Sequence, residues 1–486
     1  LRTKNMSDYA MGTFSFSPIA VGLSMAASMT SAATFIINPG FVAYYGLSGF
    51  LSMAVFLPIG ALVSLVILSK RFRKYGNVVK AKTISQWMGN RYQSKSFSLY
   101  FAFLSLLLIT FIVLICVGLT QVLSKSLNIE PVYVLSGVVA FTFGYMMFGG
   151  ANSMVYTNMI QAILMLIVAT ILLTSGFEHF SNGVEGFLDK LAAINPQLAQ
   201  PFNTGSPLFR DYFEVIICQL IVGVAIVCQP HIITRSLLLK NDKQVNMYLA
   251  TGIIVQTIFF FVVFAGLYAR LFFPDLQING SAIPLDGVMS SYVVGHFPVY
   301  ISILLVIGMI SAGISTLEGL IQSLSTTITS DIIKPITGTS IIKGVSGGLI
   351  SELALNRIVI LILALVALKL SHNQLVEPDL SVGIFAQNGV YAYFSAAFVP
   401  VLFGIFLKNV PTIAVVAGSL TAVIVHFSIY YGRLTPYMQE GTRNPGIASA
   451  IAIVSSLIVA LSIYSLTRKN KHEEMVVHMD TATVQA

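Results

Sequence analysis

Twelve apolar segments recur along this chain, and they leave little freedom in its fold. Each is long enough to cross about 30 Å of hydrocarbon at a rise of about 1.5 Å per residue. Composition supports this interpretation, because hydrophobic residues make up 56% of the 486 residues and charged residues only 9%. The sequence therefore predicts an all-α, multi-pass membrane protein with spans near residues 14–39, 49–69, 97–125, 131–148, 154–176, 211–234, 246–273, 295–330, 352–371, 381–407, 410–431 and 446–467.

The Lys and Arg residues predict how the chain lies across the bilayer, because basic loops stay on the cytoplasmic side. With the N-terminal side of the first segment placed inside, 20 of the 27 basic residues fall in loops on the cytoplasmic side. Eight of them lie between Lys70 and Lys95, a stretch without any acidic residue. We therefore expect an integral protein of the plasma (inner) membrane with a cytoplasmic C-terminus.

The same composition disfavours several functional classes. The basic block that starts at Lys70 suits a loop beside anionic lipid, so we expect no nucleic-acid partner. Cys116, Cys218 and Cys228 lie inside apolar segments without metal-binding spacing. The apolar segments contain no paired carboxylates and no His-Glu-x-x-His or Gly-x-Ser-x-Gly pattern, so we do not expect an enzyme. The expected partners are the lipid bilayer and a small-molecule substrate, and no feature indicates an obligate protein partner.

Two of the apolar segments carry signs of interrupted helices. In the first segment, nine of the eleven residues from Ser24 to Thr34 are small and none is charged. Small hydroxylated residues suit irregular backbone, which is tolerated at membrane depth only where it lines a cavity or is buried in protein. The sixth segment contains Cys228-Gln229-Pro230-His231, where Pro removes a backbone donor. Broken helices five segments apart predict an inverted repeat of five plus five helices around a central site.

The eighth segment brings hydroxyls and a carboxylate into an otherwise apolar run. Ser315 and Thr316 precede Glu318, and an ionised Glu at the bilayer centre costs on the order of 3 kcal/mol even on a lenient scale. Glu318 should therefore face protein, water or a cation. Hard cations such as sodium prefer oxygen ligands, which hydroxyls and freed carbonyls supply. The alternative is that both hydroxyls bond to their own helix and that Glu318 is hydrated near the cytoplasmic end.

Five stretches in this order resemble the sodium/solute symporter family over nearly the whole chain. They are Ser7-Asp8-Tyr9; Ser31-Ala-Ala-Thr-Phe35 with Pro39-Gly40 and Tyr45-Gly46; Phe148-Gly149-Gly150 with Ile160-Gln161; Gln229-Pro-His-Ile-Ile-Thr-Arg235; and Ile314-Ser-Thr316 with Thr329-Ser-Asp331. The resemblance implies the five-plus-five inverted-repeat fold of the leucine-transporter type with extra C-terminal helices. Similar family members have thirteen helices, so we expect about twelve here and one more upstream in the full protein.

The resemblance also implies site residues, with sodium as the coupling ion. The family's sodium pattern falls on Ala26 and Met29 in the first segment and on Ala312, Ser315 and Thr316 in the eighth. Residues expected to border the substrate cavity are Ser28, Thr30, Ser31 and Gln229. His231 is interpreted as a structural histidine at a helix break, with a proton or substrate role as the alternative.

This chain departs from the family at two positions. Many members have Asp where this chain has Asn158, so a second cation site that needs that carboxylate is in doubt, and one sodium per cycle is expected. Glu318 stands where the family often has Ser or Asp. We expect it to tune sodium affinity or to add proton sensitivity.

The substrate is narrowed only by likeness within the family. The first segment lacks the acidic and amide residues of sugar-transporting members, and the overall pattern is most like the pantothenate, monocarboxylate (acetate) and proline branches. We therefore expect sodium-coupled symport of a small carboxylate-bearing solute by alternating access. The alternatives are a proton-coupled or sodium-independent transporter of the same fold, or a membrane ligand sensor.

The predicted division of the chain follows from these segments. We expect a cytoplasmic linker at 1–13, a first five-helix repeat at 14–176, an extracytoplasmic loop at 177–210, a second five-helix repeat at 211–407, two additional transmembrane helices at 408–467, and a flexible cytoplasmic tail at 468–486. The tail assignment rests on its polar composition, which offers no apolar run to bury.

Overall fold

The computed structural model describes residues 6, 9, 17–79, 81–234, 242–337, 350–377, 381–439 and 441–484. The predicted linker 1–13 therefore lies outside the described residues apart from Met6 and Tyr9, as do Ser7, Asp8 and Arg235 of the family stretches. Within the described ranges the chain is helical throughout its apolar segments, and its strands are limited to the short hairpin of β1 (Gln277–Ile278) and β2 (Ser281–Ala282). The all-α prediction is confirmed.

The apolar segments fold into helices, several of them continued by short π or 3-10 turns. The α-helices are α2 (Pro18–Met29), α3 (Asn38–Tyr45), α4 (Leu47–Phe50), α5 (Leu57–Val79), α7 (Lys95–Leu104), α8 (Ile109–Leu127), α9 (Pro131–Met146), α10 (Ala151–Thr174), α12 (Gln219–Ile226), α13 (Pro230–Ile233), α14 (Asp242–Phe261), α15 (Ala265–Phe272), α17 (Val299–Thr327), α19 (Glu352–Val376), α20 (Val382–Phe406), α21 (Thr412–Gly432) and α23 (Pro445–Val484). The intervening turns are η1 (Ala33–Ile37), η2 (Leu51–Phe56), η3 (Ser105–Leu108), η6 (Phe213–Cys218), η8 (Val262–Phe264) and η10 (Ile328–Ile333).

Shorter elements connect these helices. They are α6 (Ile84–Tyr92), η4 (Phe177–Phe180), α11 (Gly183–Ile194), η5 (Pro196–Ala199), η9 (Leu285–Gly287), α16 (Val288–His296), α18 (Lys334–Thr337) and α22 (Pro436–Gln439).

The helices reproduce the predicted spans. Among the described residues, nine helical stretches are long and apolar enough to cross a membrane, and the bent pair formed by Pro18–Met29 and Ala33–Tyr45 makes a tenth. Two shorter apolar helices, Pro131–Met146 and Phe213–Ile226, coincide with the fourth and sixth predicted segments. Each of the twelve predicted segments thus overlaps an apolar helix.

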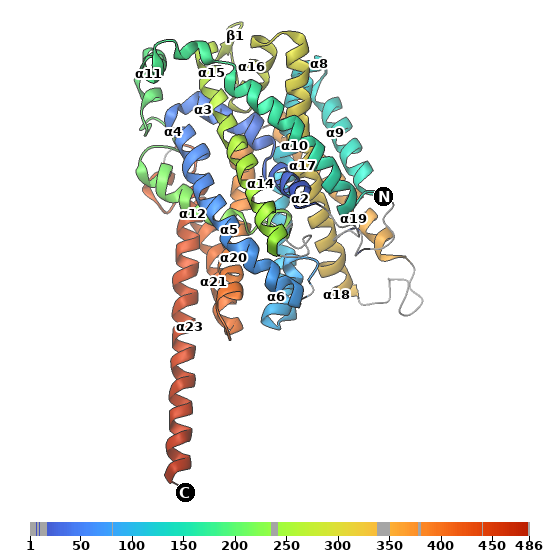
Figure 1. Cartoon of the computed structure of the whole chain (residues 1–486), viewed down its shortest axis with the longest axis vertical. Helices are drawn as coiled ribbons and strands as arrows, with labels where there is room; N and C mark the ends of the chain where they lie inside the picture. The colour runs from blue at the N-terminus through green and yellow to red at the C-terminus, as the bar shows by residue number, and fades with distance from the viewer. Residues whose placement is uncertain are drawn as a thin grey trace.

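Figure 1 shows the helices as one bundle whose two ends carry different connecting elements. α11, α15 and α16 lie at one end, and α6 and α18 lie at the other. The predicted extracytoplasmic loop (177–210) is therefore at the opposite end from α6, which lies within the most basic predicted cytoplasmic loop. This placement agrees with the alternation of loops that the sequence predicts.

Two glycines allow one pair of helices to approach closely. A Cβ atom at Gly223 of α12 would lie 2.2 Å from the carbonyl oxygen of Leu57, and one at Gly60 of α5 would lie 2.5 Å from that of Leu220. Neither contact leaves room for a side chain. Small residues at a helix crossing are the usual means by which membrane helices bring their backbones together. The crossing fixes α12, which leads into the second helix break, against α5.

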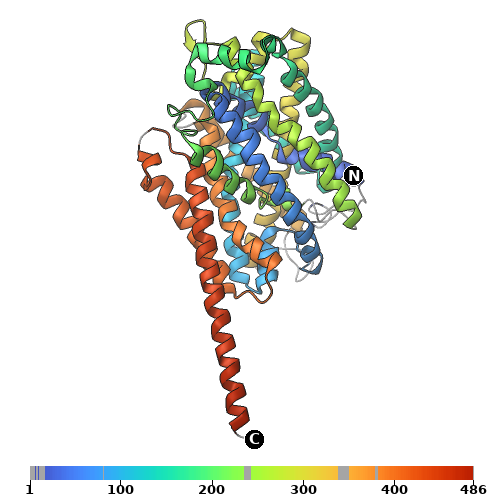
Figure 2. The same ribbon diagram turned by 60° about the vertical axis from the view of Figure 1, so that its left-hand side comes forward.

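The segment predicted as a flexible cytoplasmic tail has helical backbone over most of its length. α23 runs from Pro445 to Val484, so helical backbone continues through most of the segment 468–486. In both views this part of α23 projects from the bundle as a single helix (Figures 1 and 2). Lys, Glu and Met residues in this segment have high helix propensity. Its flexibility stays a prediction.

Candidate ion and substrate site

The first span is broken where the small hydroxylated stretch predicts. α2 ends at Met29, and Thr30 takes an extended conformation with φ −99° and ψ 116°. The helix resumes at Ala33 after a bend of 56°. The Ser31 hydroxyl accepts the N–H of Ala33 at 3.1 Å, which satisfies one of the donors exposed at the new helix start. The predicted interruption is confirmed, and it frees backbone carbonyls in the middle of the bundle.

Two hydroxyls of α17 lie against those carbonyls. The Ser315 hydroxyl oxygen is 2.9 Å from the carbonyl oxygen of Ala27 and 3.0 Å from that of Ala312. The Thr316 hydroxyl oxygen is 3.2 Å from the carbonyl oxygen of Ser28 and 3.0 Å from that of Thr30. Both side chains are fully buried. Two hydroxyl and four carbonyl oxygens therefore gather between α2 and α17, and we call them the oxygen cluster.

The oxygen cluster matches the predicted sodium residues in part. Ser315, Thr316 and the Ala312 carbonyl take part, as the sequence predicts. On α2, however, the carbonyls in contact belong to Ala27, Ser28 and Thr30 instead of Ala26 and Met29. The Ala26 carbonyl accepts the N–H of Thr30 at 3.0 Å, because the last turn of α2 closes there. Met29 instead contributes to the wall of the adjacent cavity. That sodium binds at this cluster stays a prediction.

The second break is also present. α12 ends at Ile226, Gln229 is extended with φ −64° and ψ 136°, and α13 begins at Pro230. Pro at the first helical position cannot continue the preceding helix but suits the start of a new one. The Gln229 amide donates to the carbonyl of Ile226 at 3.2 Å. Both predicted interruptions thus occur, and a cavity lies between them.

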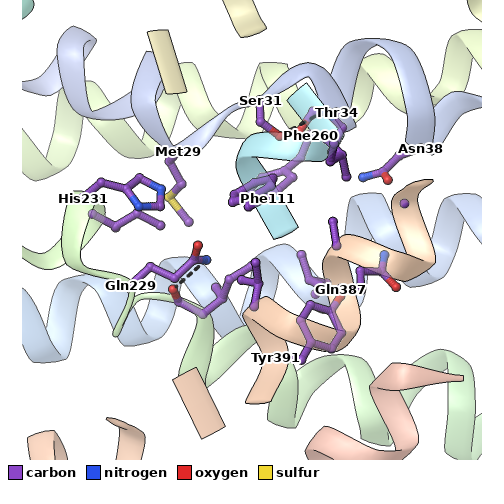
Figure 3. Close-up of a pocket in the computed structure, with 18 residues that line it drawn as sticks. Met29, Ser31, Thr34, Asn38, Phe111, Gln229, His231, Phe260, Gln387 and Tyr391 are labelled. Carbon is purple, nitrogen blue, oxygen red and sulfur yellow. Dashed lines mark hydrogen bonds between the residues drawn. The ribbon is translucent and has the colours of Figure 1, made fainter. Parts of the chain in front are cut away.

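Residues from both breaks and from α20 line this cavity (Figure 3). Of the residues predicted to border the substrate, Ser31 and Gln229 line it. His231 also lines it, with its ring centroid 6.3 Å from that of Phe111. Among the described lining residues, His231 is the one whose side chain can be charged near neutral pH. The full set is Met29, Ser31, Ala33, Thr34, Asn38, Leu57, Phe111, Leu114, Ile226, Gln229, His231, Ile232, Phe260, Gly383, Ala386, Gln387, Val390 and Tyr391.

Ser28 and Thr30 make side-chain hydrogen bonds to neighbouring helices. Their side chains are buried and are absent from the described cavity lining, and their contact with a substrate stays a prediction. The Ser28 hydroxyl accepts a hydrogen bond from the amide of Asn158 at 2.9 Å. The Thr30 hydroxyl bonds to the side chain of Gln256, with its oxygen 2.8 Å from Nε2 and 3.0 Å from Oε1. Both side chains therefore tie the broken helix to its neighbours α10 and α14, while their carbonyls join the oxygen cluster.

Sequence reasoning missed several polar residues of the cavity. Asn38 lies directly before Pro39 at the start of α3, and Gln387 is one of two adjacent amides, with Asn388, within the apolar helix α20. Thr34 and Tyr391 are further polar residues on the wall. An amide inside a membrane span is costly unless it faces a cavity or a partner, and this cost is the signal that could have identified Gln387.

Glu318 is buried within protein, as its energetic cost predicts. It is 2% exposed and accepts hydrogen bonds from two hydroxyls on other helices. Tyr145 of α9 donates at 2.5 Å and Thr157 of α10 donates at 3.1 Å. Glu318 follows Ser315 and Thr316 by less than one helical turn, so a change in its charge acts close to the oxygen cluster.

Removing this carboxylate is expected to alter ion dependence. We expect Glu318→Gln to change the sodium concentration for half-maximal uptake by about tenfold, or to shift the pH profile, because a charge-assisted hydrogen-bond network is lost. The measurement is initial uptake rate against sodium concentration at several pH values. Glu178→Gln is the matched control, since it removes the same charge from a side chain that is 60% exposed in the predicted extracytoplasmic loop. If both variants retain the parent profile, Glu318 has a purely structural role.

Comparison with known proteins agrees with this architecture. A sodium-coupled sialic acid symporter, solved in a substrate-bound outward-open state, has a TM-score of 0.75 at 18% identity and covers 96% of this chain and 93% of its own. A nucleobase-cation-symport-1 transporter, solved in a closed conformation with bromovinylhydantoin, has a TM-score of 0.55 at 14% identity. Together with the two breaks, these likenesses show the five-plus-five inverted-repeat fold of the leucine-transporter type.

Sequence comparison identifies the family. The model of the sodium:solute symporter family matches residues 9–425, and the chain belongs to this family. A sodium/pantothenate symporter of Escherichia coli (strain K12) is 30% identical over 284 residues, which are 56% of this chain and 56% of that protein. A sodium/proline symporter of Staphylococcus aureus (strain Newman) is 26% identical over 87% of this chain and 80% of its own length. The match thus spans little more than half the length of the pantothenate relative. The family and these relatives are transporters and not enzymes.

Proposed function

We propose that this protein is a secondary active transporter that couples inward movement of sodium to uptake of a small carboxylate-bearing solute by alternating access. The observation that supports it most is the position of the Ser315 and Thr316 hydroxyls on the carbonyls freed by the break in α2. Oxygen ligands of this kind suit a hard cation and add no net negative charge to the membrane interior. The proposal places sodium at the oxygen cluster and the solute in the adjacent cavity.

A carboxylate is the proposed substrate group because of what the cavity offers. Its described lining contains no Lys or Arg, so an anion there depends on backbone dipoles, hydroxyls and the nearby cation. Ser31, Ala33 and Thr34, at the start of the helix that begins at Ala33, line the cavity, and helix N-termini favour negative charge. The relatives named above are symporters of pantothenate and proline, both of which carry a carboxylate.

Orientation and stoichiometry complete the proposal. The distribution of Lys and Arg supports a plasma-membrane protein with a cytoplasmic C-terminus. Asn158 is fully buried and donates to Ser28, so it serves as a neutral link between α10 and α2. With no carboxylate at Asn158, one sodium per cycle is proposed.

A proton-coupled transporter of the same fold is the second candidate. Two observations favour it: His231 lines the cavity, and the buried Glu318 receives hydroxyl bonds near the oxygen cluster. Both groups can bind a proton. The cation requirement of transport separates this candidate from sodium coupling.

The test is uptake of labelled pantothenate, acetate, pyruvate and proline by the full-length protein in proteoliposomes. We expect at least one of these solutes to accumulate only when an inward sodium gradient is imposed. Liposomes without protein and liposomes with equal sodium on both sides are the controls. Accumulation driven by a proton gradient and indifferent to sodium would refute the sodium site and favour the second candidate.

The same vesicles report the charge that moves. One sodium with one monovalent carboxylate is electroneutral, so an imposed membrane potential should leave its uptake unchanged. One sodium transported with a zwitterion, or two sodium ions with a monovalent carboxylate, would move one net positive charge. The inward movement of that charge gains about 2.3 kcal/mol per 100 mV of membrane potential. A potassium diffusion potential therefore distinguishes a monovalent anion from a proline-like zwitterion.

A further inference from the structure

The cavity between the two helix breaks has two polar ends separated by an apolar middle. In Figure 3, Gln229 and His231 lie at one end and Asn38 and Gln387 lie at the other. The side chain of Phe111 lies between them, and Leu57 and Ile226 add to the apolar wall. A substrate that fills the whole cavity would therefore need a polar group at each end.

The Asn38 and Gln387 amides come from helices distant in sequence, α3 and α20. Both side chains are half-buried, and both line the cavity. Among the described residues, neither side-chain amide has a hydrogen-bond partner in the protein. Each amide offers one acceptor and two donors. The two amides can therefore both donate to and accept from a hydroxyl or amide group of a bound molecule.

The amide end of the cavity faces the predicted extracytoplasmic side. A second cavity shares Asn38 and Gln387 with the first, and it also shares Leu57, Phe260 and Tyr391. It continues to Leu208 and Phe209, at the end of the loop 177–210. The end with Gln229 and His231 lies instead at the second helix break, and Ser31, at the first break beside the oxygen cluster, lies between the two ends (Figure 3). The two ends are therefore chemically different: one has the ionisable His231 and the other is neutral.

We propose that Asn38 and Gln387 form a second polar subsite, which binds a hydroxyl or amide group at the far end of an elongated carboxylate. This inference rests on the proposed function in one respect, since it assigns the carboxylate to Ser31 and Gln229, the cavity residues at the two helix breaks. The apolar middle takes the carbon chain of the substrate. A carboxylate without the far polar group would desolvate the two amides without replacing their hydrogen bonds, and such a loss reduces affinity strongly.

The experiment compares two probes that differ by one hydroxyl group. Octanoate and 8-hydroxyoctanoate have the same carboxylate and the same carbon chain, and neither carries an amide group. Their dissociation constants are measured by calorimetry on the purified full-length protein in sodium buffer. We expect the hydroxylated probe to bind about tenfold more tightly, which is the effect of one well-formed hydrogen bond in a desolvated site.

Two variants on different helices test the residues. In Asn38→Leu and in Gln387→Met, the preference for 8-hydroxyoctanoate should fall to about twofold or less, while the affinity for octanoate is kept or rises because no amide is left to desolvate. Ser31→Ala is the control at the first helix break. It should weaken the binding of both probes alike and leave the ratio of their dissociation constants unchanged. Thermal melting of each variant shows whether it is folded. If one of the two variants does not fold, the other alone tests the subsite.

The outcomes separate this inference from the proposed function. If wild-type protein binds both probes equally, or if both variants retain the parent ratio, the second subsite is refuted while sodium-coupled carboxylate uptake stands. If short carboxylates such as acetate drive full uptake and neither elongated probe competes, the subsite is refuted as well. If no carboxylate binds with or without sodium, the proposed function is refuted and the subsite with it.

Discussion

Replacing Ser315 and Thr316 together with Ala is expected to abolish sodium-dependent uptake. The double variant removes both hydroxyl oxygens of the oxygen cluster and leaves the carbonyls of Ala27, Ser28 and Thr30 without the groups that face them. Hydrogen bonds or ligands to a charged partner contribute about 1.5–3 kcal/mol each, so the loss of two should weaken sodium binding by about a hundredfold or more. The measurement is the sodium dependence of uptake in proteoliposomes.

Ser311→Ala is the matched control for this variant. Ser311 lies on the same helix about one turn earlier, and its hydroxyl bonds to the carbonyl of Ile307 at 2.8 Å within α17 itself. It makes no described contact with α2, so its loss should leave the sodium dependence intact. A double variant that folds and transports with wild-type sodium dependence would show that the oxygen cluster is not the coupling site.

Replacing Gly223 with Ala is expected to destabilise the whole bundle. The new Cβ atom would lie 2.2 Å from the Leu57 carbonyl oxygen and 3.0 Å from the Ala61 nitrogen. Both are backbone atoms of α5, so no side-chain rotation relieves the clash and the helices must separate. Overpacking of this kind costs about 3 kcal/mol or more when backbone has to move. The measurement is the melting temperature of the purified protein in detergent.

Gly137→Ala is the control: it makes the same substitution in a helix where it should not lower the melting temperature. Gly137 lies within α9, and a Cβ atom there meets nothing within 4 Å among the described atoms. Ala favours a helix over Gly by about 0.5–1 kcal/mol, so the melting temperature should stay equal or rise slightly. Equal melting temperatures for the two variants would mean that the α5 and α12 crossing adapts to a larger residue.

The course of the chain through the membrane could be predicted because it depends on local properties. Apolar length determines each span, and the two interruptions follow from small hydroxylated residues around Thr30 and from Pro230. The burial of Glu318 could also be predicted, since exposure of a carboxylate to lipid is too costly. These statements require no knowledge of which helices are neighbours.

The details of the site could not be predicted, because they depend on packing. The direction of each carbonyl and side chain near the break changes where Thr30 leaves helical geometry, so the contacts fall on Ala27 and Ser28 instead of Ala26 and Met29. For the same reason Thr30 points to Gln256 and not to the cavity. Asn38 and Gln387 meet only because α3 and α20 line one cavity. A single sequence does not display such neighbours.

The absence of fixed charge along the described cavity lining has a thermodynamic consequence. Apart from His231, the lining supplies no group that is charged near neutral pH, so the proposed sodium is the positive charge nearest to the proposed carboxylate among the described residues. Binding of either one then raises the affinity for the other, and by linkage the two factors are equal. Couplings between sites are typically about 1–3 kcal/mol, or about 5- to 150-fold in affinity. Each ligand alone would therefore occupy the protein weakly, and neither would commit it to the transport step without its partner.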